Sequence, residues 1–434
     1  MTIVPKAPAA LVSRRRISWP KRLCFTLVCL CLLTGFVELV CYIGLKWITY
    51  ATVAQVRHNR EMDADYESEK LDYAREVNHP YVGWTRNPGF HSPELFEGRE
   101  FQPNDFGLVD EGSPIRKRSP DKIIVAVAGG SVSWQMTASG EGAFLRELRR
   151  QPRFQGKQVE LVRLAVSGFK QPQQLMLLTF LLSLGAEFDV LVNIDGYNET
   201  ALHPVENALG GVFPPYPRAW RARLSDTINL QDLQTKAALL SSIARRRARS
   251  KWYRQLPFQD SATINFLWLS LHHRYLQQEV EWNMKVLAAQ LERPGYQVLG
   301  PKQTFRDDAE MFDYLVEYWA QCSRQMRLLC QANSIQYYHV LPPNQYLAGS
   351  KPQMTEQEKT VAFLESKYSA TATRAYPLLV KKGQELRNEG LKFYDLTQLF
   401  SAVDEPTYID NFCHYNVAGN ALFAAAVAKI LGTP

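Results

Sequence analysis

The run from Lys122 to Ala128 constrains the fold most, because it is apolar, rich in β-branched residues and followed by a sharp turn. Such a run is typical of a strand buried on both faces of a parallel sheet. It ends in Gly129-Gly130-Ser131, where two glycines allow a tight turn and leave room for another molecule to approach. A helical stretch follows. We expect the strand to deliver Ser131 to the carboxyl edge of a sheet, where open α/β sheets carry their chemistry. The simpler alternative is a serine that caps the next helix.

Strand-like and helix-like segments alternate after this turn. We expect further strands at 159–166, 189–194, 335–341 and 391–394, and helices at 140–151, 173–184, 311–332, 355–389 and 418–431. Such alternation predicts a parallel sheet with right-handed crossovers. The expected fold class is therefore α/β with three layers, a helical insertion and an N-terminal transmembrane helix.

The N-terminal part of the chain carries a membrane signal. The run from Leu23 to Trp47 is apolar apart from Glu38 and Lys46, and by helix rise it is long enough to cross a bilayer. Six basic residues and no acid precede it, which places the N-terminus in the cytoplasm and the rest in the periplasm or outside the cell. We expect an uncleaved single-pass anchor, although Ala51 and the alanine at position 54 leave cleavage open. Glu38 is costly at membrane depth and either marks a helix partner or, as the simpler account for a residue past the middle of the span, is protonated or snorkels to the interface.

Composition divides the chain into four regions. Residues 1–22 form a basic cytoplasmic tail and 23–47 the anchor. Residues 48–120 begin as a polar stalk with a helical stretch at 61–70 and continue as an extended segment rich in Pro, Gly and aromatic residues. Residues 121–434 form the main domain, which contains a helical insertion at about 200–333.

The charge pattern points to a membrane rather than to nucleic acid. Most of the formal net charge of +7 lies before the anchor. A second basic cluster at 245–251 is interpreted as a solvated helix face, because no nucleic-acid-binding motif surrounds it. No Cys or His grouping has metal-ligand spacing, and no phosphate-binding or dinucleotide fingerprint follows a strand. We expect no cofactor and no metal; a partner membrane protein remains open.

Polar residues after several strands have complementary chemistry. A serine nucleophile needs a base, a group that orients the base, and donors for the oxyanion. Gly168 follows the second strand with a backbone N–H, and Asn198 follows the third with a side-chain donor. His414 precedes the last helix, with Asp410 four residues earlier. Each has a structural alternative, a turn position for Gly168 and Asn198 and a helix cap for His414. Together with Ser131, these roles favour a catalytic set.

Other serine machineries fit less well. The nucleophile elbow of α/β-hydrolases has glycine where this chain has Ser133, and a Ser-x-x-Lys arrangement needs lysine where Trp134 stands.

The ordered set Ser131, Gly168, Asn198 and His414 resembles the four blocks of the SGNH (GDSL-like) hydrolase superfamily. The resemblance covers about 121–200 and 335 to the end; the insertion and the anchor lie outside it. It implies a flavodoxin-like parallel sheet of the SGNH hydrolase type, with Ser131 as nucleophile and His414 as base. It also implies an oxyanion hole made by the N–H of Ser131, the N–H of Gly168 and the side-chain amide of Asn198.

The chain departs from this family at the acid. The family's orienting acid lies three residues before the histidine, where this chain has Asn411, whereas Asp410 lies four before. Either the loop bulges so that Asp410 reaches His414, or Asn411 orients the imidazole. We expect Asp410, because a carboxylate stabilises the imidazolium that forms during attack.

The anchor and several short segments look like membrane-anchored bacterial members associated with cell-surface polysaccharides. The segments are His79-Pro-Tyr, Gly-Gly-Ser, Asp195-Gly-Tyr-Asn-Glu and Leu341-Pro-Pro-Asn-Gln-Tyr. The expected function is an exported serine esterase, or an O-acyltransferase, acting on an acylated carbohydrate or another ester, with O-acetyl as one candidate. The alternative is an inactive scaffold or glycan-binding protein.

Overall fold

The computed structural model describes residues 18–49, 51–65, 75–89, 94–96, 99–224, 230–291, 295–364 and 366–432. Most of the basic tail and residues 66–74 of the expected stalk lie outside this part. The chain divides into two compact units. One contains residues 1–69 and 229–289, and the other contains 70–228 and 290–434. We call them the anchor unit and the sheet unit.

The sheet unit is built on a five-stranded parallel sheet. Its strands are β5 (Lys122–Gly129), β6 (Gln158–Arg163), β7 (Val190–Ile194), β8 (Gln336–Leu341) and β9 (Phe393–Asp395). Their order is β6-β5-β7-β8-β9, which is the 2-1-3-4-5 order of flavodoxin-like doubly wound sheets. The α/β class and the parallel sheet predicted from the sequence are confirmed.

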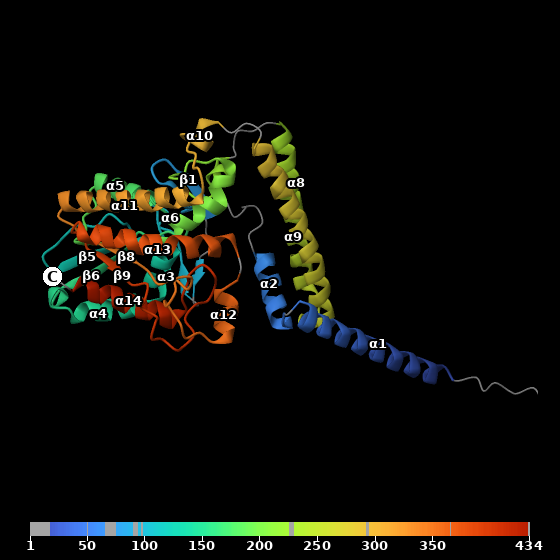
Figure 1. Cartoon of the computed structure of the whole chain (residues 1–434). Coiled ribbons are helices and arrows are strands. Elements are labelled where there is room, and N and C mark those ends of the chain that lie inside the picture. Colours follow the sequence, from blue (N-terminus) through green and yellow to red (C-terminus); the bar gives the residue numbers. More distant parts are fainter. Residues whose placement is uncertain are drawn as a thin grey trace, which may run out of the picture. The chain divides into compact units, whose positions relative to one another are not determined.

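Helices cover both faces of the sheet (Figure 1). One face carries α3 (Ser131–Ser139), α4 (Glu141–Arg150) and α14 (Val417–Leu431). The other carries α5 (Gln173–Ser183), α6 (Tyr197–Leu202), α11 (Asp308–Ala332) and α13 (Lys367–Asn388). Shorter elements are α7 (Trp220–Arg223), α10 (Tyr296–Leu299), α12 (Glu356–Ala362), a π-helical turn (His203–Asn207) and 3₁₀ turns at Pro152–Phe154 and Ala208–Gly210.

The order of the strands fixes where a site can form. β5 lies between β6 and β7, so the connections after neighbouring strands leave toward opposite faces and open a crevice at their carboxyl ends. The interior of β5 is fully buried, as its apolar and β-branched composition predicts. Ser131 begins α3 at this crevice, directly after the Gly129-Gly130 turn.

The segment before β5 packs on the sheet unit. It contains two antiparallel hairpins, β1 (Glu76–His79) with β2 (Gly83–Arg86) and β3 (Glu94–Phe96) with β4 (Arg99–Phe101). Trp84 of β2 is fully buried in the main core. Asp110 accepts a hydrogen bond of 2.7 Å from the guanidinium of Arg163 in β6. Residues 75–120 therefore belong to the sheet unit.

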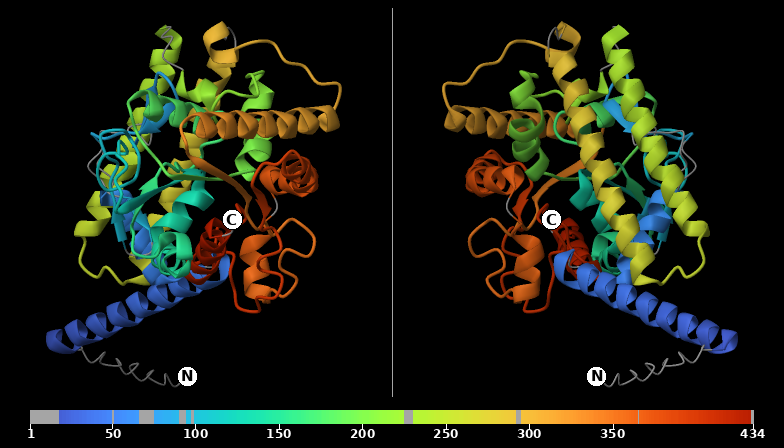
Figure 2. Two further views of the ribbon diagram at one scale, coloured as in Figure 1. Left: turned by 90° about the vertical axis from the view of Figure 1, so that its left-hand side faces the viewer. Right: turned by 90° about the vertical axis from the view of Figure 1, so that its right-hand side faces the viewer.

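The anchor unit is helical. It consists of α1 (Trp19–Ile48), α2 (Val53–Asp65) and a long hairpin made by α8 (Leu230–Gln255) and α9 (Ala262–Leu291). Figure 2 shows α8 and α9 side by side, with α1 leaving from one end of the hairpin. Among the described residues, α1 is the one helix long and apolar enough to span a membrane. The region expected as one insertion is thus divided, because the hairpin groups with the anchor whereas α11 packs on the sheet.

One expected helix, at 355–389, is wrong as a continuous element. It is two helices, α12 and α13, and each begins with its own cap. The side chain of Thr355 accepts from the N–H of Glu358, and that of Ser366 accepts from the N–H of Ser369. A capping side chain satisfies a free N–H at a helix start, so Ser366 favours a new beginning over continuation.

Candidate active site

Ser131 stands at the amino end of α3 without capping it. The cap position is Gly130, and no side-chain hydrogen bond closes this end. Gly129 adopts a φ of +141°, and a Cβ there would lie 2.1 Å from the carbonyl oxygen of Ile194. Only glycine fits this turn. Ser133 is fully buried and donates to the same carbonyl oxygen at 2.7 Å, so Ser131 is the serine left to face the crevice.

The loop before α14 brings His414 back toward Asp410. Oδ1 of Asp410 accepts from the N–H of Phe412 at 2.8 Å, which forms a tight side-chain turn. Cys413 is buried in the left-handed region with a φ of +59°, a conformation that costs energy for a residue with a Cβ. The N–H of Ile409 then donates to the carbonyl of His414 at 3.1 Å and closes the loop.

A continuous hydrogen-bonded array joins three of the predicted site residues. Nε2 of His414 lies 2.7 Å from Oγ of Ser131, and its Nδ1 lies 2.6 Å from Oδ2 of Asp410. The helix cap expected as the alternative role of His414 is supplied by Asn416, whose side chain accepts from the N–H of Gly419. Both distances are within hydrogen-bond range, so a hydroxyl, an imidazole and a carboxylate follow one another in the order that nucleophilic catalysis by a serine requires.

The acid in this array is Asp410 rather than Asn411. The amide of Asn411 donates to the carbonyl of Leu364 at 3.1 Å and lies 3.4 Å from Oγ of Ser366. Burial raises the pKa of Asp410. Its hydrogen bond to His414, the charge of His414 and hydrogen bonds from two backbone N–H groups lower this pKa by more, so that the net pKa lies below the normal value. The carboxyl group is therefore ionised at neutral pH and accepts from the imidazole.

Asn198 and Gly168 lie around the same serine turn. The side-chain amide of Asn198 donates to the carbonyl of Phe169 at 2.7 Å. A Cβ placed on Gly130 would lie 2.4 Å from this Nδ2 atom, so the amide sits directly against the turn that carries Ser131. Gly168 adopts a φ of +90° one residue before Phe169. The three loops after β5, β6 and β7 thus meet at one point.

A buried polar network behind the site was missed by the sequence analysis. The carboxylate of Asp195 lies 2.7 Å from Nε2 of His339 and accepts from Trp319, Asn193 and Gln171 at 2.6 to 2.9 Å. Burial raises the pKa of Asp195, but the charge and hydrogen bond of His339, together with the other donors, lower it to below normal. His339 is fully buried and positions the strand ends rather than reaching a substrate. Its one signal in the sequence is a histidine within an apolar strand.

Glu199 holds the turn that presents Asn198. It accepts from the N–H of Gly196 at 2.7 Å and from the N–H of Gln171 at 2.9 Å. Burial, with the nearby charge of Asp195, raises the pKa of Glu199 to about 8. These bonds connect the loop after β7 to the loop after β6.

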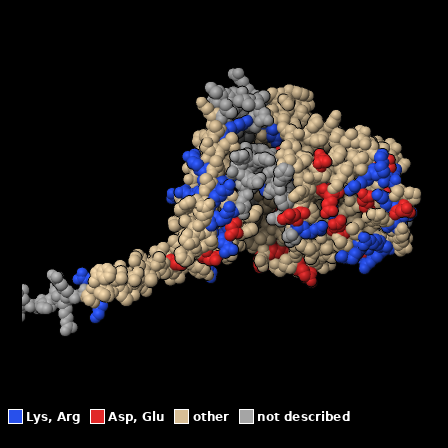
Figure 3. All heavy atoms as spheres, turned by 180° about the vertical axis from the view of Figure 1, so that it is seen from behind, with Lys and Arg blue, Asp and Glu red and all other residues tan. Residues whose placement is uncertain are grey.

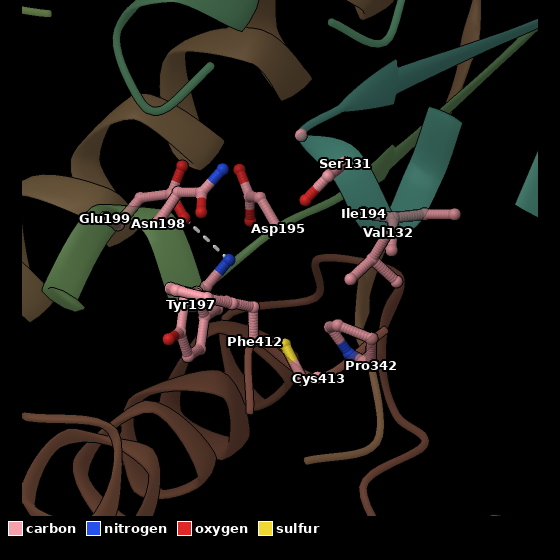
Figure 4. A pocket seen from close by; sticks show the side chains of 12 residues that line it. Ser131, Val132, Ile194, Asp195, Tyr197, Asn198, Glu199, Pro342, Phe412 and Cys413 are labelled. Atoms are coloured by element: carbon pink, nitrogen blue, oxygen red, sulfur yellow. Dashed lines mark hydrogen bonds between the residues drawn. The ribbon is translucent and has the colours of Figure 1, made fainter. Parts of the chain in front are cut away.

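A pocket opens beside Ser131 (Figure 4). It encloses about 290 Å³ of empty space, counting the part open to solvent. Its lining combines Ser131, Asn198 and Asp195 with apolar side chains. The apolar members are Val132, Ile194, Pro342 and Phe412, from four separate segments of the chain. The site can therefore accept a small, largely apolar group next to the serine.

Comparisons with known proteins add little to this geometry. No protein-family model matches the chain, and no curated protein matches it. Among solved structures, it is similar to one described as the crystal structure of an acetyl xylan esterase, AlAXEase. That similarity has 14% sequence identity and a TM-score of 0.32, and covers 71% of this chain and 98% of the other. At this level the likeness carries no argument about activity, so the function has to be argued from the site.

Proposed function

We propose that the protein is a membrane-anchored serine ester hydrolase or O-acyltransferase of the SGNH type. The observation that carries the proposal is the array from Ser131 through His414 to Asp410, with both contacts within hydrogen-bond distance. The position of this array at the crevice between β5 and β7 supports it, because doubly wound sheets bind ligands there.

The first half-reaction uses Ser131 as the nucleophile. Its Oγ attacks the ester carbonyl carbon while Nε2 of His414 takes the hydroxyl proton. The ionised Asp410 keeps the Nδ1 proton in place and stabilises the imidazolium. The N–H groups of Ser131 and Gly168 and the amide of Asn198 stabilise the oxyanion. When the tetrahedral intermediate collapses, the alcohol leaves with the proton from His414, and the acyl group remains on Ser131.

The second half-reaction decides between hydrolase and transferase. Water or a sugar hydroxyl gives its proton to Nε2 of His414 and attacks the acyl-enzyme carbonyl. Collapse then returns the proton to Oγ of Ser131 and releases an acid or a new ester. Product analysis with an acyl donor and a glycan acceptor distinguishes the two outcomes.

The pocket supports a small acyl group. Apart from its open mouth, the pocket has room of only about 20 Å³, little more than the ~10–15 Å³ that one water needs. So narrow a space favours an acyl group as small as acetyl, and O-acetyl groups of cell-surface polysaccharide are the proposed substrate class. We expect kcat/KM to be higher for p-nitrophenyl acetate than for p-nitrophenyl octanoate.

The anchor unit supports a retained membrane helix, and the basic residues before this helix support a cytoplasmic N-terminus. Leu45 of α1 is 1% exposed and packs in a common core with Trp268 of α9. Signal cleavage after α1 would remove Leu45 and expose this core. The main part of the chain then lies on the periplasmic or extracellular side.

Labelling with a serine-reactive fluorophosphonate tests the proposal. The full chain should be labelled at Ser131, and Ser131→Ala should lose both the label and esterase activity. Ser139→Ala is the matched control, because its hydroxyl donates to the carbonyl of Gln135 in its own helix. Absence of label on the wild type, with unchanged glycan binding in Ser131→Ala, would instead identify a non-catalytic glycan-binding protein.

A further inference from the structure

Glu38, the acid within the apolar helix α1, holds the start of α9. Its Oε2 accepts from Oγ of Ser261 at 2.8 Å, from Oγ1 of Thr263 at 2.7 Å and from the N–H of Thr263 at 3.1 Å. The N–H of Ala262 also donates to this carboxylate. The first N–H groups of a helix lack partners within it and favour a negative charge. Glu38 therefore accepts hydrogen bonds from N–H groups at the start of α9 that have no partner within the helix.

The contact continues toward the end of α1. A Cβ on Gly44 would lie 2.9 Å from the ring of Phe266, so the two helices are in close contact there. Leu45 packs with Trp268 and Leu269 in the core of the anchor unit. Residues later in α1 contact residues later in α9, so the two helices run parallel from Glu38 onward.

The position of Glu38 along α1 fixes the depth of the hairpin. About 20 helical residues cross the hydrocarbon of a bilayer, and counted from Leu23 they reach Tyr42. Glu38 therefore lies in the last turns of the span, about 15 Å by helix rise before Ile48. The connection between α8 and α9, residues 256–261, meets α1 at this level. We call these residues the hairpin tip.

The hairpin tip and its flanks expose large apolar side chains. Phe258 is 80% exposed, and Trp252 in the last turn of α8 is 55% exposed. Phe258 also adopts a φ of +63°, a region that bulky residues avoid. Trp side chains concentrate at membrane interfaces, and exposed Phe side chains accompany them on segments that lie in the interface.

The charges around the tip suit an anionic bilayer. Lys251 is half-buried and Arg254 is exposed, and both lie in the last turns of α8. Figure 3 shows Lys and Arg side chains along the hairpin, with Asp and Glu side chains among them where it meets α1. The one acid of the tip, Asp260, is 2.7 Å from the guanidinium of Arg57 and is thereby neutralised. Basic residues beside exposed aromatic side chains are typical of segments that bind anionic headgroups.

We propose that the hairpin tip inserts beside α1 into the non-cytoplasmic interface of the membrane that α1 spans, where Phe258 and Trp252 contact anionic phospholipid. Glu38 is the latch that keeps the tip at this depth. The inference rests on the proposed role of α1 as a membrane span. It gives the anchor unit a second contact with the bilayer, so the unit is held by the hairpin as well as by one helix.

Photo-crosslinking to lipid tests the insertion. The full chain is reconstituted in vesicles of phosphatidylethanolamine and phosphatidylglycerol, with p-benzoylphenylalanine replacing Phe258. Two matched positions accompany it, Leu32 in the middle of α1 and Leu209 in the sheet unit, which are 70% and 81% exposed. Mass spectrometry of the peptides should find lipid adducts at 258 and 32 and none at 209. Vesicles of phosphatidylcholine alone should reduce the adduct at 258 and leave that at 32 unchanged.

The outcomes separate this inference from the proposed anchor. Adducts at 32 without adducts at 258 would overturn the insertion of the hairpin tip and would still support α1 as a membrane span. Absence of adducts at 32 would overturn both. Glu38→Ala should reduce the adduct at 258 by at least about fivefold, the low end of typical coupling, without changing the adduct at 32. An unchanged adduct at 258 in this variant would refute the latch. Fluorophosphonate labelling of each variant confirms that the sheet unit is folded.

Discussion

Nδ1 of His414 lies 2.6 Å from a carboxylate oxygen of Asp410, the residue four positions before it, although the resemblance places the acid three positions before. The loop accommodates the extra residue through the turn at Asp410 and the left-handed conformation of Cys413. Asp410→Asn should therefore lower kcat by about 10³–10⁴-fold, because the imidazole loses its orientation and charge stabilisation. Steady-state kinetics on p-nitrophenyl acetate measures the loss.

Asn411 provides the control for this change. Its side chain binds Leu364 and Ser366 rather than His414, so Asn411→Ala should keep kcat within about threefold of wild type, as expected away from the reacting groups. Equal and small effects of both substitutions would show that Ser131 and His414 act as a dyad.

Asn198→Ala should reduce kcat by about 10²–10³-fold with little change in KM, because an oxyanion donor acts mainly in the transition state. The amide has one proton committed to the carbonyl of Phe169 and a second available for the oxyanion. Stopped-flow measurement of acylation isolates this step. A rise in KM at constant kcat would show that Asn198 serves ground-state binding instead.

Gly130→Ala tests the same donor by steric means. The φ of Gly130 is −96°, so alanine causes no left-handed strain, but its Cβ would meet Nδ2 of Asn198 at 2.4 Å. We expect activity to fall by more than about tenfold, the equivalent of 1.4 kcal/mol in the barrier, while the thermal midpoint changes little. Gly142→Ala, where a Cβ approaches Arg146 at 3.4 Å, should keep wild-type activity and leave the thermal midpoint unchanged or slightly raised, since alanine favours the helix. Similar activity of the two variants would argue against the position assigned to Asn198.

Lys170 predicts a dependence of stability on pH. It is 2% exposed and donates to the carbonyl of Pro214 at 2.6 Å, and burial lowers its pKa from 10.5 to about 8. Between these values the unfolded chain binds more protons, so the folded state gains stability as pH rises from 8 to 10.5. Lys170→Met should lack this gain, which amounts to at most about 3 kcal/mol.

Urea unfolding of the detergent-solubilised chain at several pH values measures this difference. Comparing wild type with Lys170→Met removes the contribution of other groups that titrate in the same range. If the difference in free energy of unfolding stays constant over this pH range, burial does not lower the pKa of Lys170 in the folded state.

The sheet was predictable because its strands are continuous apolar runs, and β5 shows how directly such a run specifies a buried parallel strand. The break between α12 and α13 was not, since a serine in position to cap a new helix also occurs within helices. The choice between Asp410 and Asn411 depends on a loop closed by contacts outside it, such as that of Asn411 with Leu364. His339 and its contact with Asp195 join strands 144 positions apart, which no local pattern encodes.

Ser131 and His414 are separated by 283 positions, and the hairpin of the anchor unit lies between them in the chain. During synthesis Ser131 emerges early, whereas His414 follows only with the loop that precedes α14. A chain interrupted anywhere before Asp410 can display the serine but has no group to take its proton. Under the proposed mechanism, reactivity toward esters therefore begins only after the loop before α14 has been made and has folded against Ser131.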